Sequence, residues 1–92
     1  MARKYLSIKF RAEVFREEDM YVAICPELDV SSFGVTVEEA KESLREAVEA
    51  FVEGCQSLGT LEEVLQEAGF QREHDNWVAR EPVEAEMLVA VA

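Results

Sequence analysis

The sequence predicts an α+β fold in which helices cover one face of a mainly antiparallel sheet. Two kinds of pattern support this prediction. Residues 5–15 and 83–91 alternate along the chain in the way that β-strands do. Residues 34–59 instead repeat apolar side chains at spacings of three and four, which is the period of an amphipathic helix. The predicted order is a three-stranded antiparallel meander, a long helix, a short helix and a final strand (β-β-β-α-α-β).

The meander occupies the N-terminal part of the chain. Its first strand, over residues 5–15, has one mainly apolar and one mainly polar face. A charged run separates it from the second strand, residues 20–25, which Pro26 ends because proline has no N–H group to donate to a neighbouring strand. Residues 30–35 form the third strand, and Gly34 allows a close approach or an unusual backbone conformation before the helix.

The long helix has the strongest signals at its two ends. Thr36 is the predicted N-cap, and Glu39 completes a capping box with it. Gly59 ends the helix. The apolar stripe consists of Val37, Ala40, Leu44, Ala47, Val48, Phe51, Val52 and Cys55. Such a stripe is stable only when it is buried, so we expect the strands to pack against it.

Three segments complete the predicted fold. Thr60 and Glu63 repeat the capping-box pattern at the start of a short helix that ends at Gly69. Residues 70–82 mix aromatic and charged side chains, and two alternatives stand for them, a loop or a loose hairpin. Residues 83–91 form the final strand. Because this strand is apolar on both faces toward its end, it would invite pairing with another chain at a sheet edge.

Composition and charge restrict the class of protein. The 92 residues are 49% hydrophobic, which predicts one domain (1–92) with a small core. Nine basic and 20 acidic side chains give a net charge of −11, which argues against direct nucleic-acid binding because phosphate contacts need a basic surface. The charge favours a basic protein partner or simply solubility. No segment approaches the about 18 apolar residues of a membrane span, so we expect a cytoplasmic protein without a membrane partner.

Three short motifs together resemble a known family. They are YVAICPEL at residues 21–28, GVTVEEA at residues 34–40 and EA at residues 46–47. This combination resembles the HicB-like antitoxin family, in which a Y-V-A-x-x-P-x-L strand end precedes a G-x-T-x-E-E-A helix start. The matched region covers about half of the chain. The resemblance implies a HicB-like partial RNase H-like fold, with an extra short helix before the last strand.

The resemblance also implies a function. HicB-like proteins sequester HicA, a small basic ribonuclease toxin with the shape of a double-stranded-RNA-binding domain. Family members usually carry a C-terminal DNA-binding module, which these 92 residues do not contain, so we expect no operator binding. For stand-alone relatives without that module, the resemblance implies a fold but no established activity. The alternative is therefore a solitary homo-oligomeric domain that binds a small ligand or another protein.

An RNase H-like fold calls for a search for catalytic carboxylates. The candidates at strand ends and turns are Glu13, Asp19, Glu27 and Asp29. Turns commonly carry solvated acidic residues, so we expect no magnesium cluster. His74 has no nucleophile beside it, and Ser31 and Ser32 are expected to be structural. Cys25 and Cys55 have no metal-binding spacing and are expected to be buried free thiols. We therefore predict a non-catalytic protein without metal or cofactor.

Two binding surfaces are predicted instead. The first is the acidic face of the long helix, formed by Glu38, Glu42, Glu46, Glu49 and Glu53, which would attract a basic toxin together with the acidic turn at residues 17–19. The second is a self-association surface formed by Tyr5, Phe15, Tyr21, Leu88, Val89 and Val91. It combines aromatic side chains on a polar sheet face with the apolar last strand.

Overall fold

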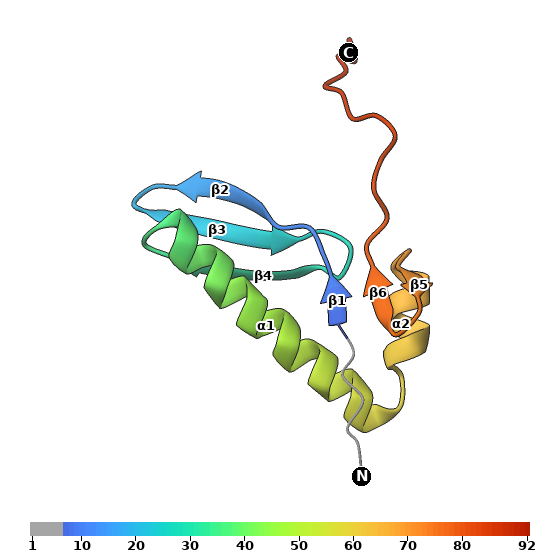
Figure 1. Ribbon diagram of the computed structural model, residues 1–92. Helices are drawn as coiled ribbons and strands as arrows, with labels where there is room; N and C mark the ends of the chain where they lie inside the picture. The colour runs from blue at the N-terminus through green and yellow to red at the C-terminus, as the bar shows by residue number, and fades with distance from the viewer. Residues whose placement is uncertain (1–6) are drawn as a thin grey trace.

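The structure, a computed structural model, describes residues 7–92 and has an α+β fold (Figure 1). The described residues form two helices and six strands in two small sheets. The strands are β1 (Ser7–Lys9), β2 (Glu13–Glu17), β3 (Met20–Cys25), β4 (Val30–Gly34), β5 (Gln71–Glu73) and β6 (Asn76–Val78). The helices are α1 (Val37–Leu58) and α2 (Leu61–Glu67). The predicted α+β class is confirmed.

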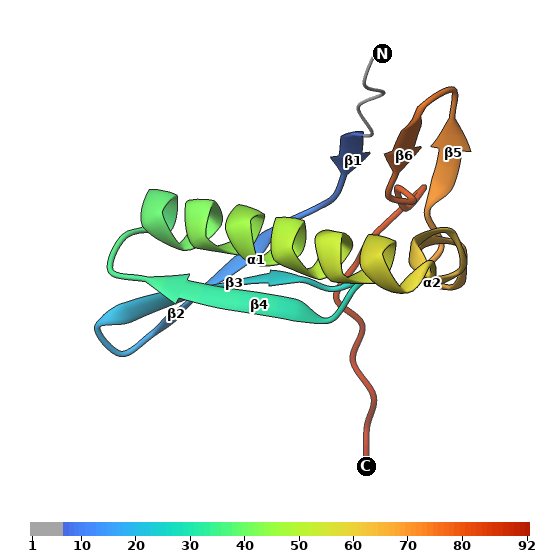
Figure 2. The same cartoon turned by 90° about the horizontal axis from the view of Figure 1, so that it is seen from below.

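The first sheet is the antiparallel meander β2-β3-β4, and α1 packs on one of its faces (Figure 2). Ala23 and Cys25 of β3 are completely buried beneath the helix. Ala40 and Leu44 of α1 are also completely buried, so the core lies between the sheet and the apolar stripe of the helix. The predicted second and third strands and the long helix are confirmed.

The predicted first strand, residues 5–15, is wrong as a single element. Its described part divides into β1 and β2, which belong to different sheets, and residues 10–12 lie in neither strand. Between the two strands, the Arg11 guanidinium binds the Glu27 carboxylate at 2.7 Å. The alternating pattern runs through this break because alternation reports which face a side chain takes, and says nothing about which strand each half pairs with.

Residues 70–82 contain a hairpin, which is the second of the two alternatives predicted for this segment. Strands β5 and β6 pair antiparallel, and His74 turns the chain between them with a positive φ of 60°. Phe70 and Trp77 anchor the hairpin in the core with exposed fractions of 4% and 3%. Strand β6 pairs in parallel with β1, and the Ala79 N–H donates to the Lys9 carbonyl at 2.8 Å. The second sheet therefore has the order β1-β6-β5.

The predicted final strand, residues 83–91, is wrong. These residues form no strand and leave the body of the molecule after β6 (Figure 1). The strand that follows the helices is β6 instead, and it pairs in parallel with β1. Pro82 follows the last paired residues and has no N–H group to continue the pairing.

The ends of the helices confirm one capping box and correct the other. The Glu39 N–H donates to Thr36 Oγ1 at 3.0 Å, and the Glu39 carboxylate accepts from the Val35 N–H at 3.3 Å. At the second helix, the predicted box of Thr60 and Glu63 does not form, because Thr60 lacks the extended backbone of an N-cap and its hydroxyl donates to the Cys55 carbonyl instead.

Candidate functional site

The sheet β2-β3-β4 has an apolar face that points away from α1, here called the outer face. Paired residues on neighbouring strands share a face, and Val22 pairs with both Phe15 and Phe33. Because Ala23 and Cys25 point into the core, their neighbours on β3 point outward. Phe15 and Phe33 are 51% and 64% exposed. The apolar side chains of the outer face are Phe15, Met20, Val22, Ile24 and Phe33, and their pairing partners Glu13, Glu17 and Ser31 share it.

The second exposed apolar element is the C-terminal segment of residues 83–92, here called the tail. Its sequence is VEAEMLVAVA, so that Glu84 and Glu86 are its only charged side chains. The large apolar side chains Val83, Met87, Leu88, Val89 and Val91 have exposed fractions between 81% and 106%. Contiguous apolar surface of this kind marks sites of interaction with another molecule.

The structure places the predicted self-association residues on different surfaces. Phe15 lies on the outer face, and Leu88, Val89 and Val91 lie in the tail. Tyr21 pairs with Arg16 on the opposite face and packs against the core, so the expectation that it shares a face with Phe15 is wrong. Tyr5 lies outside the described residues.

Phe33 is an outer-face residue that the sequence analysis did not select. Its signal was present in the third strand. In that strand Val30 and Ser32 alternate with Ser31 and Phe33, so the inward position of Val30 places Phe33 on the outward side. Reading the three strands together, rather than the first two alone, would have found it.

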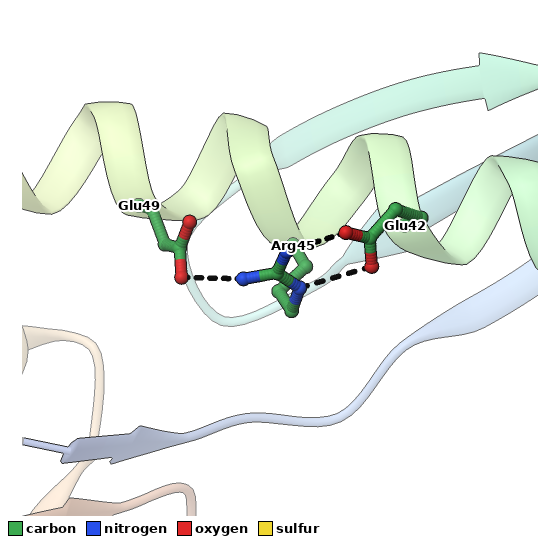
Figure 3. Close-up of polar contacts among 3 residues, drawn as sticks. All are labelled: Glu42, Arg45 and Glu49. Atoms are coloured by element: carbon green, nitrogen blue, oxygen red, sulfur yellow. Dashed lines mark hydrogen bonds and ion pairs between the residues drawn. The ribbon is translucent and has the colours of Figure 1, made fainter.

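The five predicted acidic residues all lie on the exposed side of α1, with Arg45 among them. They are Glu38, Glu42, Glu46, Glu49 and Glu53. The Arg45 guanidinium binds both oxygens of Glu42 and donates to Glu49 Oε2 at 2.6 Å (Figure 3). Its hydrogen bonds lower the pKa of the Glu42 carboxyl below its ordinary value. Lys41 pairs with Glu38 at 2.9 Å, and within residues 7–92 Glu46 and Glu53 form no ion pair.

A groove of about 750 Å³ separates this acidic face from β1. Its lining combines apolar side chains from both elements with charged side chains of α1. The apolar lining residues are Ile8, Phe10, Val48 and Val52, and the charged ones are Arg45, Glu49 and Glu53. An apolar surface beside carboxylates suits the side chain of a lysine or arginine, whose aliphatic stem and charged head need these two environments.

The candidate catalytic carboxylates are dispersed. Glu13 lies on the outward side of β2, Asp19 lies in the turn before β3, and Glu27 is held by Arg11. Within the described residues, no three His, Cys, Asp or Glu side chains are grouped to hold a metal ion. The same residues contain no helix long and apolar enough to cross a membrane. Nothing in this arrangement assembles the carboxylates for phosphodiester hydrolysis.

The cysteines are both buried and both free thiols. Burial raises the pKa of the Cys25 thiol, partly offset by backbone hydrogen bonds at Leu28 and Glu27. A buried thiol with a raised pKa is a poor nucleophile, because the thiolate is the reactive form. Cys25 is therefore a core residue.

Comparison of the chain with protein-family models, curated proteins and solved structures gives no match.

Proposed function

We propose that this chain is a HicB-like antitoxin-type protein that binds a small basic ribonuclease of the HicA kind and covers its cationic surface. The motifs at residues 21–28 and 34–40 suggest this family, with its partial RNase H-like fold. The observation that carries the proposal is the groove between β1 and α1, with glutamates along its helical side. In this role the chain performs no catalysis itself.

The groove explains how a basic partner would be held. The aliphatic stem of a partner lysine or arginine packs on Ile8 and Val52, and its charged head reaches Glu53. Glu53 is available because Arg45 already pairs with Glu42 and Glu49. The remaining acidic surface speeds the encounter, since a net charge of −11 attracts a cationic protein over several ångströms of solvent.

The test is binding to a HicA-like ribonuclease encoded beside this chain, measured by calorimetry. Reversing the two carboxylates that line the groove and a third on the acidic face of α1 (Glu49→Lys, Glu53→Lys and Glu46→Lys) should raise the dissociation constant by at least about tenfold. A matched control reverses three exposed glutamates outside α1 and the tail, Glu67, Glu73 and Glu81. It makes the same change in net charge and should have a much smaller effect.

Two results would count against this proposal. Equal losses in the two triple variants would mean that only net charge matters and that the groove is not the contact. Absence of binding by the unmodified chain would remove the antitoxin role. In that case the alternative applies, a solitary domain that assembles with itself, and the exposed outer face and tail favour it.

A further inference from the structure

We infer that two copies of this chain exchange their tails, each tail pairing as a β-strand with the free edge of β2 in the other copy. This inference rests on the self-association proposed above and does not require a toxin. It assigns the partner as a second copy and names the two segments that meet.

Strand β2 has an unpaired edge. It is the outermost strand of the sheet β2-β3-β4, so among the described residues the backbone groups on its outer side have no strand partner. An exposed edge of this kind is a template for another strand. The tail leaves the molecule on the side of the sheet opposite α1, beyond the β2 edge (Figures 1 and 2). Ten extended residues span about 33 Å, more than the length of a five-residue strand.

The apolar pattern of the tail suits this edge. A strand beside β2 would need apolar side chains on its outward side, next to Phe15, and also on its inward side, next to Val14. The inward side needs them because α1 lies mainly over β3 and β4 and leaves Val14 half-buried. Residues 87–91 have this composition, with Met87, Val89 and Val91 on one side and smaller or branched apolar residues on the other.

The tail does not pair with the edge of its own chain. Strand β6 runs parallel to β1 only as far as Val78, and the Ala79 N–H donates to the Lys9 carbonyl, but β1 and β2 belong to different sheets and residues 83–92 form no strand. The tail instead leaves the body of the molecule with its large apolar side chains exposed, so a second copy can meet it.

Reciprocal exchange of tails is also compatible with the large negative charge of the chain. Two chains of net charge −11 repel each other, so a stable contact must use the least charged surfaces. Residues 87–92 of the tail carry no charged side chain, the β2 part of the outer face carries only Glu13 and Glu17, and the acidic face of α1 lies on the other side of the sheet. A two-fold axis would cover both tails at once, as is usual for homodimers.

The test uses the full-length chain in two measurements. Sedimentation should show a dimer at high micromolar concentration. In a dimer mixed from ¹³C-labelled and unlabelled chains, isotope-filtered nuclear Overhauser spectra should connect the methyl groups of Val89 and Val91 in one copy with the Phe15 ring of the other. Contacts found only within one chain would overturn tail exchange, and so would their absence.

Variants separate this inference from self-association in general. The double change Val89→Glu and Val91→Glu should weaken dimerisation by at least about tenfold, because it places charges in an apolar contact. The control is Leu58→Glu, an exposed apolar residue at the end of α1, which should leave the dimer unchanged. A dimer unaffected by the double change would overturn tail exchange alone. A monomeric unmodified chain would overturn both proposals of self-association and leave toxin binding untouched.

Discussion

Gly34 lies where β4 passes the first turn of α1, and there is no space beside it. A Cβ atom at this position would lie 2.6 Å from the Ala40 nitrogen and 2.8 Å from the Glu39 carbonyl carbon. Both are backbone atoms of the helix, so the sheet and helix would have to separate. We expect Gly34→Ala to lower the free energy of unfolding by about 1–3 kcal/mol in urea denaturation.

The control for this change is a glycine inside α1. Gly54 lies inside α1 and a Cβ atom there would meet nothing within 4 Å. Gly54→Ala should therefore raise the free energy of unfolding by about 0.5–1 kcal/mol, because alanine loses less backbone entropy in a helix. Two alanine variants of equal stability would show that Gly34 is not a point of close contact.

The buried thiol of Cys25 makes the free energy of unfolding depend on pH in the alkaline range. Burial raises the pKa of its thiol in the folded state, so folding favours the protonated form. The resulting contribution is complete below the pKa of the unfolded thiol, about 8.5, and is lost as pH rises through the folded pKa. Urea denaturation should show the free energy of unfolding falling more steeply above this pH for the unmodified chain than for Cys25→Ala. Parallel pH profiles would contradict this.

Single residues also show the limit of prediction from sequence. The buried or exposed state of most α1 residues follows from their place in a 3.6-residue period. Ala40, Leu44 and Val48 are buried as expected, whereas Val37 in the first turn is 39% exposed. The residues of the outer face were predicted less well from the sequence. Phe15 was selected with Tyr21, although their strands pair so that the two point to opposite faces. The face of a residue within one strand is local information, whereas register between strands is not.

At the scale of elements, the two threonines that precede the helices differ in their caps. Thr36 accepts a hydrogen bond from the Glu39 N–H, whereas Thr60 gives no side-chain cap to α2. We expect Thr36→Ala to lower the free energy of unfolding by about 1 kcal/mol and Thr60→Ala to lower it less. Thermal unfolding followed by circular dichroism measures both. A larger loss at Thr60 would mean that its hydroxyl bond to Cys55 matters more than the cap of α1.

The predicted elements were reliable where their signals are local. Caps and periodicity located α1 close to its observed bounds, because both depend on residues within a few positions of each other. Residues 83–91 alternate as a strand would, but they pair with no strand of their own chain, and so the predicted strand does not form. The hairpin of β5 and β6 was predicted only as one of two alternatives, because three-residue strands are too short to show a period. The pairing of β6 with β1 was missed because it joins residues far apart in sequence.

For the whole molecule, the sheet β2-β3-β4 separates the two proposed surfaces. The acidic face and its groove lie on the α1 side, and the outer face lies on the opposite side. The two contacts therefore need not compete. A tail-exchanged dimer would present two acidic helix faces, each free to hold one basic partner.

Salt should act on the two contacts in opposite directions, because they differ in the sign of their electrostatics. Two copies of net charge −11 repel, and raising ionic strength shortens the range of this repulsion from about 30 Å at 0.01 M to about 10 Å at 0.1 M. The apolar contact of tail and outer face does not depend on charge, so dimerisation should tighten with added salt. Binding of a basic ribonuclease to α1 is attractive at long range and should weaken over the same interval. Sedimentation and calorimetry at the two concentrations measure both trends. Weakening of the dimer by salt would mean that ion pairs, rather than the tail and the outer face, hold the copies together.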